Sequence, residues 1–331
     1  MELLDNYNRK LNYLRISVTD RCNLRCIYCK PDGKIPELKH KDILTYEEFF
    51  RLSNIAINMG VSKIRLTGGE PLSRLGLVDF SQKLADTGKL KDIGITTNAV
   101  YLMKYLDDFT KNPIVRFNIS LDTLNREKYK QLTGADKFDK VWEAIEAAVE
   151  IGFHPLKINM VAMKGINDDE VADMARLTIN HPITLRYIEY MPMNSEGNKL
   201  ANLHTFYASD IKAKLESELG ELTPIGRNIN DGPAIRYQIK GALGEVGFIN
   251  PMSHRFCEEC NRMRLTSTGG LRPCLLNNTR IDIRTPMRNG ATDSELAAIL
   301  LKAASLKNAA HNLAKTEEEG DSLLHMGSIG G

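Results

Sequence analysis

Three of the six cysteines in this 331-residue chain stand in residues 20–29, which read Asp20-Arg21-Cys22-Asn23-Leu24-Arg25-Cys26-Ile27-Tyr28-Cys29. The spacing is CxxxCxxC, and the stretch directly follows the run 13–18 (YLRISV), which predicts a β-strand. In barrels of alternating strands and helices, active sites lie at the carboxyl ends of the strands. Thiolates hold iron–sulfur clusters, and a cubane normally takes four of them. Three cysteines in one loop would therefore leave the fourth iron open for a small molecule.

Two other interpretations of these cysteines are weaker. A structural zinc ion takes four protein ligands, and no fourth Cys or His lies near this triplet in the sequence. A disulfide framework fits poorly in a chain of this length that shows no secretion signal, because cytosolic thiols are kept reduced. No apolar run approaches the roughly 20 residues that span a bilayer. We therefore expect a cytoplasmic protein that makes no membrane contact.

The charge balance argues against nucleic acid as a partner. The chain has 44 basic and 42 acidic residues, a formal net charge of +2, and no clear basic stripe. Nucleic-acid binding normally shows as a basic excess or a basic patch. Any anionic substrate must therefore be held by a few locally placed cations.

Alternating strand and helix patterns predict the fold. Strands are expected at 13–18, 62–67, 92–97, 114–121, 155–163 and 183–190, and helices at 45–59, 138–151, 168–179 and 293–315. Alternation of this kind predicts a parallel sheet. Six units are many for a small open sheet and too few for an eight-fold barrel. The predicted fold class is therefore α/β, a partial (βα)6 TIM-type barrel over residues 1–225, with a smaller C-terminal α+β region over 226–331. The polar segment 196–204 is expected to be a linker.

Three of the predicted strands carry polar residues at alternate positions. Side chains alternate across a strand, so each polar set shares one face while apolar residues share the other. Barrel interiors are normally packed with apolar side chains, so a cationic interior indicates a cavity for an anionic ligand. The alternative is that these strands lie near an edge and that water solvates their cations. The polar sets are Lys63, Arg65 and Thr67; Arg116, Asn118 and Ser120; and Lys157 and Asn159.

A second cysteine triplet stands near the C-terminus. Cys257 and Cys260 form a CxxC pair, and Cys274 follows after thirteen residues. A zinc site completed by His254 is one interpretation, since Cys₃His sites are common. The other is a second iron–sulfur cluster that also has an open iron.

Several motifs together resemble one family, the GTP 3′,8-cyclases of the radical S-adenosylmethionine (SAM) superfamily, also called molybdenum cofactor biosynthesis protein A. They include the CxxxCxxC loop and Thr67-Gly68-Gly69-Glu70-Pro71, which is similar to the GGE motif of the superfamily. Ala99 departs from the family pattern, in which Gly is usual at that position. The resemblance covers nearly the full length, through the stretches 14–23, 63–72, 118–124, 164–168, 186–193 and 244–274.

The resemblance implies two [4Fe–4S] clusters, one on Cys22, Cys26 and Cys29 and one on Cys257, Cys260 and Cys274. It implies SAM contacts at Tyr28, Gly68, Gly69, Glu70, Ser120 and Met191. The implied GTP contacts are Arg15, Lys63, Arg65, Thr96, Lys157, Arg186, Arg262, Met263 and Arg264. The implied catalytic residues are Arg15, Arg262, Arg264 and the terminal Gly330 and Gly331, which in the family reach the active site.

The reaction that the resemblance implies is the first step of molybdenum cofactor biosynthesis. A 5′-deoxyadenosyl radical abstracts the ribose 3′ hydrogen of GTP, and C3′ then bonds to C8 of the same guanine, giving (8S)-3′,8-cyclo-7,8-dihydroguanosine 5′-triphosphate. The implied partners are an electron donor, a downstream cyclic pyranopterin monophosphate synthase and a second copy in a homodimer. Two alternatives remain open: a peptide-modifying radical SAM enzyme with an auxiliary cluster, and a metal-binding scaffold without catalysis.

Overall fold

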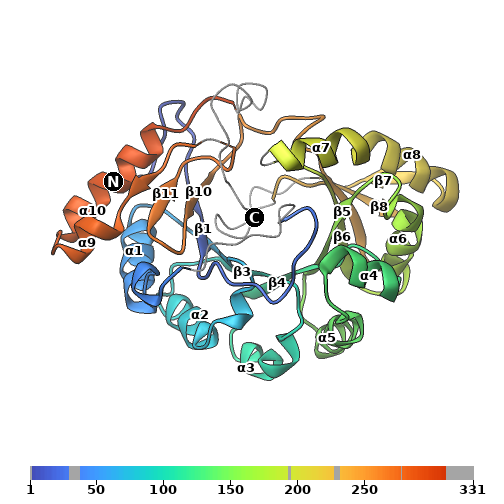
Figure 1. The fold of residues 1–331 in the computed structure, drawn as a ribbon, viewed down its shortest axis with the longest axis horizontal. Helices are drawn as coiled ribbons and strands as arrows, with labels where there is room; N and C mark the ends of the chain where they lie inside the picture. Colours follow the sequence, from blue (N-terminus) through green and yellow to red (C-terminus); the bar gives the residue numbers. More distant parts are fainter. Residues whose placement is uncertain (1, 30–37, 193–194, 227–231, 277, 311–331) are drawn as a thin grey trace.

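The computed structural model describes residues 2–29, 38–192, 195–226, 232–276 and 278–310. Within these residues the strands form one curved sheet with helices along its outer side, as Figure 1 shows. The strand order is β12-β11-β10-β1-β2-β3-β4-β5-β6-β9-β8-β7. The edge strands β12 and β7 do not pair with each other, so the sheet is curved but not closed.

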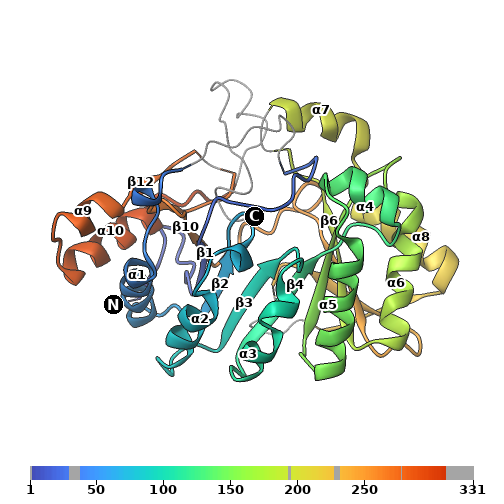
Figure 2. The same ribbon diagram turned by 60° about the horizontal axis from the view of Figure 1, so that its bottom comes forward.

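Six parallel strands form the centre of this sheet, and helices connect them along the outer face (Figures 1 and 2). This arrangement confirms the predicted α/β fold, a partial (βα)6 barrel. The strands are β1 (Tyr13–Ser17), β2 (Lys63–Thr67), β3 (Asp92–Thr97), β4 (Val115–Ser120), β5 (Leu156–Ala162) and β6 (Ile183–Glu189). The helices are α1 (Tyr46–Asn58), α2 (Leu77–Ala85), α3 (Leu106–Thr110), α4 (Arg126–Thr133), α5 (Phe138–Ile151) and α6 (Val171–Asn180).

Strands from the C-terminal part extend the sheet at both edges. Strand β10 (Arg262–Leu265) pairs in parallel with β1, and β9 (Glu245–Ile249) pairs in parallel with β6. The outer strands then pair antiparallel: β11 (Gly270–Arg272) and β12 (Ile281–Asp282) on one side, β8 (Ile235–Ile239) and β7 (Leu222–Pro224) on the other. The region after 225 therefore flanks the six-stranded barrel on two sides, and the domain boundary at 225 stays a prediction.

Several predicted elements differ from the structure. The segment 196–204, expected to be a linker, lies in helix α7 (Ser195–His204), and α8 (Ala208–Leu219) follows it. Helix α10 (Asp293–Ser305) follows α9 (Arg284–Arg288) and ends ten residues before the predicted end at 315; residues 306–310 are not helical, and 311–315 lie outside the described residues. Four short 3₁₀ turns complete the described chain: η1 (His40–Asp42), η2 (Pro71–Ser73), η3 (Leu102–Lys104) and η4 (Asp168–Glu170). Among the helices that the structure describes, none has the length and apolar character to cross a membrane.

The two faces of the strands separate apolar from polar side chains, as the alternation predicts. On β2, Ile64 and Leu66 are fully buried in the core cluster beneath the outer helices, and Arg65 faces the inside of the barrel. Arg116 is an exception. It stands near the amino end of β4, and its guanidinium donates to the carbonyls of Pro113 and Val115 rather than reaching the inner cavity.

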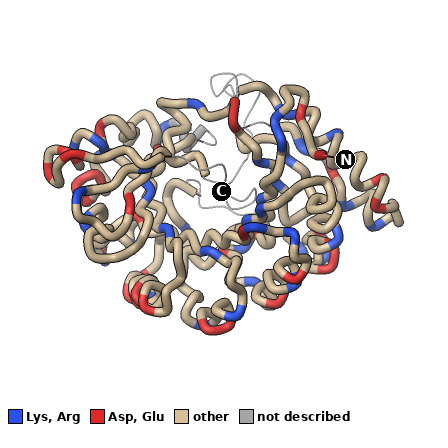
Figure 3. The backbone as a smooth tube through the Cα atoms, turned by 180° about the vertical axis from the view of Figure 1, so that it is seen from behind, with Lys and Arg blue, Asp and Glu red and all other residues tan. Residues whose placement is uncertain are grey.

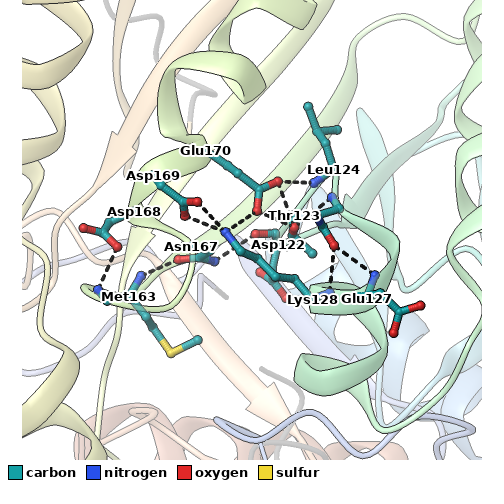
Figure 4. A network of polar contacts seen from close by, with 12 residues as sticks. Asp122, Thr123, Leu124, Glu127, Lys128, Met163, Asn167, Asp168, Asp169 and Glu170 are labelled. Carbon is teal, nitrogen blue, oxygen red and sulfur yellow. Dashed lines mark hydrogen bonds and ion pairs between the residues drawn. The ribbon is translucent and has the colours of Figure 1, made fainter.

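A buried polar network joins the loops that follow β4 and β5 (Figure 4). Asn167 is fully buried, and its amide nitrogen donates to the carbonyls of Asp122 (2.8 Å) and Val161 (3.0 Å). Its side-chain oxygen accepts from the backbone N–H of Met163 at 2.8 Å. One amide side chain thus satisfies three backbone groups, two in buried and one in a partly buried hydrogen bond, which fixes the two loops against each other.

The same network contains a buried carboxylate. Glu170 accepts from the hydroxyl of Thr123 at 2.7 Å and from the backbone N–H of Leu124 at 2.7 Å. Lys128, on α4, lies 2.8 Å from the Glu170 carboxylate. These contacts join the start of α6 to α4. The connections that follow β4 and β5 are therefore held together at the carboxyl ends of these two strands.

Replacing Asn167 should destabilise the protein measurably. Asn167→Ala would remove two buried hydrogen bonds and one partly buried hydrogen bond to the backbone, and each buried group left without a partner costs about 1–3 kcal/mol. We expect a free energy of unfolding lower by about 3 kcal/mol or more, measured as a shift of the denaturant midpoint at unchanged slope. The control is Asn289→Ala, at an exposed position after α9. Equal midpoints for the two variants would contradict this account of the network.

Candidate active site

The carboxyl ends of the barrel strands open into a cavity of about 350 Å³. Side chains from β1 to β6 line it together with residues of the C-terminal part, so it forms where all the crossover loops meet. Most of the residues that the sequence singles out lie here. They are Arg15, Cys22, Cys26, Tyr28, Cys29, Lys63, Arg65, Gly68, Gly69, Glu70, Thr96, Ser120, Lys157, Arg186, Met191, Cys257, Cys260, Arg262, Arg264 and Cys274.

Three of the predicted site residues are not in this set. Met263 lies on β10 between Arg262 and Arg264, so its side chain points to the opposite face of the strand. It is 1% exposed and belongs to the core cluster, so its side chain does not face the cavity, and the expected GTP contact at Met263 stays a prediction. Gly330 and Gly331 lie outside the described residues.

The first cysteine loop is held by backbone contacts with α4. Backbone N–H groups of Arg25 and Ile27 donate to the carbonyls of Thr133 (2.8 Å) and Leu132 (3.0 Å). Within the loop, the N–H of Cys29 donates to the carbonyl of Cys26 at 3.0 Å. The positions of the cysteines therefore follow from the fold of the loop on the last turn of a helix.

Cys22, Cys26 and Cys29 are all half-buried, and none of them forms a disulfide bond. The sulfur of Cys22 accepts from the N–H of Leu24 at 3.4 Å and from the Asn98 side chain at 3.7 Å. Burial raises the pKa of the Cys26 thiol well above its usual value, and the charges of Asp122 and of the other two cysteines raise it further. The mutual effect of the three thiols shows that they lie close together. Bound metal would lower the pKa of each.

The GGE motif holds the start of this loop to the end of β2. The N–H of Gly69 donates to the carbonyl of Thr19 (2.8 Å), and the N–H of Glu70 donates to that of Arg21 (2.7 Å). A Cβ added at Gly69 would stand 2.2 Å from the Arg21 oxygen. The glycines are therefore needed because two backbones approach closely here, a reason that the sequence alone did not reveal.

The carboxylate of Glu70 is already occupied by protein groups. It accepts from the N–H of Leu72 (2.9 Å), the hydroxyl of Thr97 (2.7 Å) and the N–H of Asn98 (2.7 Å). Burial raises its pKa to about 7, although these hydrogen bonds oppose the rise. Its role in the structure is to join the end of β2 to the end of β3, where Ala99 adopts φ +61° in place of the usual glycine.

Tyr28 is fixed by a buried acid. Its hydroxyl donates to Asp122 at 2.6 Å, and the other oxygen of Asp122 accepts from the N–H of Val161 at 2.8 Å. Burial raises the pKa of Asp122 to about 6, against the effect of these hydrogen bonds. The pair links the cysteine loop to the ends of β4 and β5.

Cations from five strands face the cavity. Figure 3 shows Asp and Glu mainly along the outer helices, whereas Lys and Arg also occur on the inner strands. Burial, reinforced by the other cations, lowers the pKa values of Arg15 to about 10, Arg186 to about 9 and Lys157 to about 8. Lowered pKa values of this kind mean that these cations have too few acidic neighbours to stabilise their charged forms fully. The array consists of Arg15, Lys63, Arg65, Lys157, Arg186, Arg262 and Arg264.

Neighbouring side chains and one glycine position several of these cations. Arg186 donates to the side chain of Asn118 at 2.6 Å. Lys63 pairs with Asp92 at 2.8 Å, at the amino end of β3. Gly94 lies beneath the Arg65 guanidinium, where an added Cβ would stand 2.7 Å from Cζ. The cations are thus arranged before any ligand binds.

Tyr13 stands among these cations, and the sequence prediction missed it. Arg65 Nε donates to the Tyr13 hydroxyl at 2.6 Å. Burial raises the pKa of Tyr13, but the charges of Arg65, Arg15, Lys63 and Arg262 outweigh burial and lower it to about 7. Tyr13 shares its strand face with Arg15, so the alternation rule could have found it.

The second cysteine triplet borders the same cavity. The N–H of Cys260 donates to the carbonyl of Cys257 at 3.1 Å, and Arg262 lies over the Phe256 ring with Cζ 5.0 Å from its centre. Burial raises the pKa of Cys260, but the charges of Arg262 and Lys307 outweigh it and lower the pKa to about 6. A thiol of this kind is readily deprotonated, as a metal ligand must be.

A buried glutamate holds the loop that leads to this triplet. Glu189 ends β6 and is 1% exposed. It accepts from the backbone N–H groups of Ala208, Met252 and Ser253, each at 3.0 Å, and from the Ser253 hydroxyl at 2.5 Å. An acid at the carboxyl end of a strand is a signal that the sequence offered and that the prediction did not use.

The donor sets fit iron–sulfur clusters better than single zinc ions. His254, the expected fourth ligand of a zinc site, is exposed and does not line the cavity. Among the described residues, no three His, Cys, Asp or Glu side chains are arranged to hold one metal ion. In a cubane each thiolate binds a different iron, so its ligands lie farther apart than those of one ion. Two sets of three thiols that line one cavity are therefore compatible with cubanes.

Comparisons with known proteins agree with this geometry. The family description "Radical SAM superfamily" matches residues 16–178, and "Molybdenum Cofactor Synthesis C" matches residues 183–313. The chain is 44% identical to a GTP 3′,8-cyclase of Heliobacterium modesticaldum, over 99% of this chain and 100% of the relative. It is 44% identical to a GTP 3′,8-cyclase of Desulforamulus reducens, over 94% and 95%.

The fold is similar to that of a solved crystal structure, Streptococcus suis SuiB bound to S-adenosylmethionine. The TM-score is 0.64 at 17% identity, and the match covers 83% of this chain and 64% of the SuiB chain. At that identity the similarity concerns the fold alone. With 44% identity to curated relatives over nearly its whole length, this chain belongs to the GTP 3′,8-cyclase family of the radical SAM superfamily.

Proposed function

We propose that this protein is a GTP 3′,8-cyclase that converts GTP to (8S)-3′,8-cyclo-7,8-dihydroguanosine 5′-triphosphate, the first step of molybdenum cofactor biosynthesis. One observation carries the proposal: two triplets of cysteines that form no disulfide bonds and a cationic array from five strands line a single cavity. The family supplies the reaction, since the curated relatives are named for it.

The first triplet would hold a [4Fe–4S] cluster on Cys22, Cys26 and Cys29. When bound together with SAM, this cluster supplies the 5′-deoxyadenosyl radical on which the reaction depends. Around it, Tyr28, Ser120 and Met191 line the cavity where SAM would lie. Because the Glu70 carboxylate is occupied by three protein donors, we assign the SAM contact of the GGE motif to the backbone of Gly68 and Gly69.

The cationic array would bind the triphosphate of GTP. A triphosphate needs several donors in fixed positions, which Arg side chains supply in rigid geometry. Thr96 lies within 3.5 Å of Arg65 and would add a hydroxyl donor. Holding the nucleotide at its phosphates limits its motion, so that C3′ and C8 can be kept in near-attack geometry. Arg15, Arg262 and Arg264 are the members that we propose as catalytic.

The second triplet would hold another [4Fe–4S] cluster, with its open iron toward the guanine base. The support is the chemistry of the donors: Cys257, Cys260 and Cys274 line the cavity, and the lowered pKa of Cys260 favours its thiolate. Phe256 and Leu275 add apolar surface to the same part of the cavity, suited to a flat base. For Gly330 and Gly331, the proposed role in the active site rests on the family resemblance alone.

The electron donor, the cellular location and the protein partners are also proposals. A reductive cleavage needs an electron from outside the cavity, so we propose a separate electron donor. A cytoplasmic location is supported by the six cysteines, none of which forms a disulfide bond, because reducing compartments disfavour disulfides. A homodimer and a downstream cyclic pyranopterin monophosphate synthase are proposed from the family resemblance.

A peptide-modifying activity is the alternative that the same cysteines would allow. The array of seven cations is the feature that separates the two functions, since a polyphosphate matches its charge and an ordinary peptide does not. The cyclase is therefore the better match to this cavity.

The decisive experiment is an anaerobic assay of the reconstituted protein with SAM, a strong reductant and GTP. We expect 5′-deoxyadenosine and the 3′,8-cyclised nucleotide in comparable amounts, and no cyclised product when ATP replaces GTP. Formation of 5′-deoxyadenosine with GTP left intact would show a radical SAM enzyme with another substrate. That result would overturn the proposed function.

Replacing one cation should weaken GTP binding without loss of iron. Lys157→Met removes a charge-assisted contact worth about 1.5–3 kcal/mol, so we expect the Kd for GTP to rise about 10- to 100-fold. Calorimetry on the reconstituted protein measures the Kd, and iron analysis checks the clusters. The matched control is Lys164→Met, because Lys164 is exposed in the turn after the same strand. Similar Kd values for both variants would rule out Lys157 as a phosphate ligand.

GTP affinity should fall as pH rises from about 7 to 9. In the free protein Tyr13 becomes an anion above a pKa of about 7, and Lys157 becomes neutral above about 8. Both changes remove positive charge from the site. A bound polyanion raises both pKa values, so binding near pH 8 should take up protons, seen as a dependence of the calorimetric enthalpy on buffer.

The variant Tyr13→Phe isolates part of this pH effect. It cannot ionise, so its loss of affinity should begin about one pH unit higher than in the unmodified protein. Comparing the two proteins cancels the titration of the nucleotide itself. Identical pH profiles would show that Tyr13 does not titrate in the site.

A further inference from the structure

Lys307 is a buried lysine beside the second cysteine triplet, and the proposed function gives it no role. It is 4% exposed and lies two residues beyond the end of α10. Its ammonium donates to the carbonyl of Arg262 at 2.9 Å and to that of Pro273 at 2.6 Å. Arg262 lies two residues after Cys260, and Pro273 immediately precedes Cys274. One ammonium therefore joins the two backbone segments that carry these cysteines.

The same ammonium also faces the cysteine sulfurs. Its side chain hydrogen-bonds to Cys260, and its charge interacts with Cys260 and Cys274. An ammonium has three N–H donors, and two carbonyls and one sulfur use all three. A buried cation is costly unless it is paired and hydrogen-bonded, so this position needs negative charge on the cysteines.

Arg9 fixes the third cysteine to the same segment. Its guanidinium donates to the carbonyl of Cys257 at 2.6 Å, to that of Asn308 at 2.6 Å and to that of Ala309 at 3.0 Å. Asp5 holds the guanidinium in place through a contact of 2.5 Å with Nε. Residues 307–309 thus contact the backbone around all three cysteines, either directly or through Arg9.

We propose that Lys307 is the positioning residue of the second cysteine triplet, which holds the two cysteine segments in register and offsets the negative charge of a cluster bound there. This inference rests on the proposed second cluster. Hydrogen bonds and positive charge next to cluster sulfurs raise the reduction potential. Partners of metal ligands also set metal affinity, with typical losses of 10- to 100-fold when they are removed.

The test uses the full chain with Cys22, Cys26 and Cys29 each changed to Ser, so that only the second cluster can form. Lys307→Met, Lys307→Gln and Lys307→Arg are then compared in this background after anaerobic reconstitution. Iron content and the reduction potential, followed by electron paramagnetic resonance, are the two readouts. The matched control is Lys302→Met, because Lys302 is exposed on α10.

We expect Lys307→Met to lose at least half of its iron and to shift the potential downward. The expected shift is at least tenfold in the ratio of oxidised to reduced cluster, about 59 mV for a one-electron couple. Lys307→Gln keeps a hydrogen-bond donor without the positive charge, so it should lower the reduction potential even where iron is retained. It also serves as the test if Lys307→Met does not fold. Lys307→Arg and Lys302→Met should both resemble the parent.

Two results would overturn the inference, and they are distinguishable. If the parent binds iron but Lys307→Met and Lys307→Gln keep its iron content and potential, Lys307 does not act on the cluster. If the parent itself binds no iron, the second cluster of the proposed function fails, and the inference fails with it.

Discussion

The constraint on which the rest of this structure depends is the placement of seven buried or partly buried cations around one cavity. Burial, reinforced by the neighbouring positive charges, lowers the pKa values of Arg15, Lys157 and Arg186, so holding these groups charged has a cost in the free protein. The fold accommodates them without a matching set of acids, using neutral partners such as Asn118 and the space above Gly94. The missing negative charge is what a polyphosphate ligand would supply. Binding and stability of this protein are therefore linked through the same side chains.

Acidic residues are present at this end of the barrel, but they act on the backbone rather than on the cations. Glu70 joins β2 to β3, Asp122 joins the cysteine loop to β5, and Glu189 holds the loop before the second triplet. Each is buried and accepts hydrogen bonds from protein donors. The loops that carry the cysteines are thus fixed by carboxylates, while the cations line the cavity. A site organised before binding loses less entropy when the ligand arrives.

The sequence was informative wherever a local rule applies. Strand alternation placed Lys63, Arg65 and Lys157 on the inner face, because side-chain direction in a strand depends only on position. The same rule places the Met263 side chain in the core. The expected GTP contact at Met263 came from the family resemblance and not from this rule. Polar composition suggested a linker at 196–204, yet these residues lie in helix α7, because composition alone does not define a helix boundary. Lys307 had no local signal, since its partners lie 34 and 45 residues away in the chain.

The open sheet explains how one cavity comes to be bordered by both cysteine triplets. A closed eight-stranded barrel fills its interior with side chains, whereas six strands leave two free edges. Here β10 and β9 occupy those edges, and β10 brings Arg262 and Arg264 into register with β1, opposite Met263 on the outer face. The position of the second triplet follows from the pairing of β10 with β1, because Cys260 precedes β10 and Cys274 follows β11. The two triplets are therefore placed by backbone pairing within a single sheet, and not by the docking of a separate body. Any substitution that weakens the β1–β10 pairing should disturb the second triplet and the arginines together.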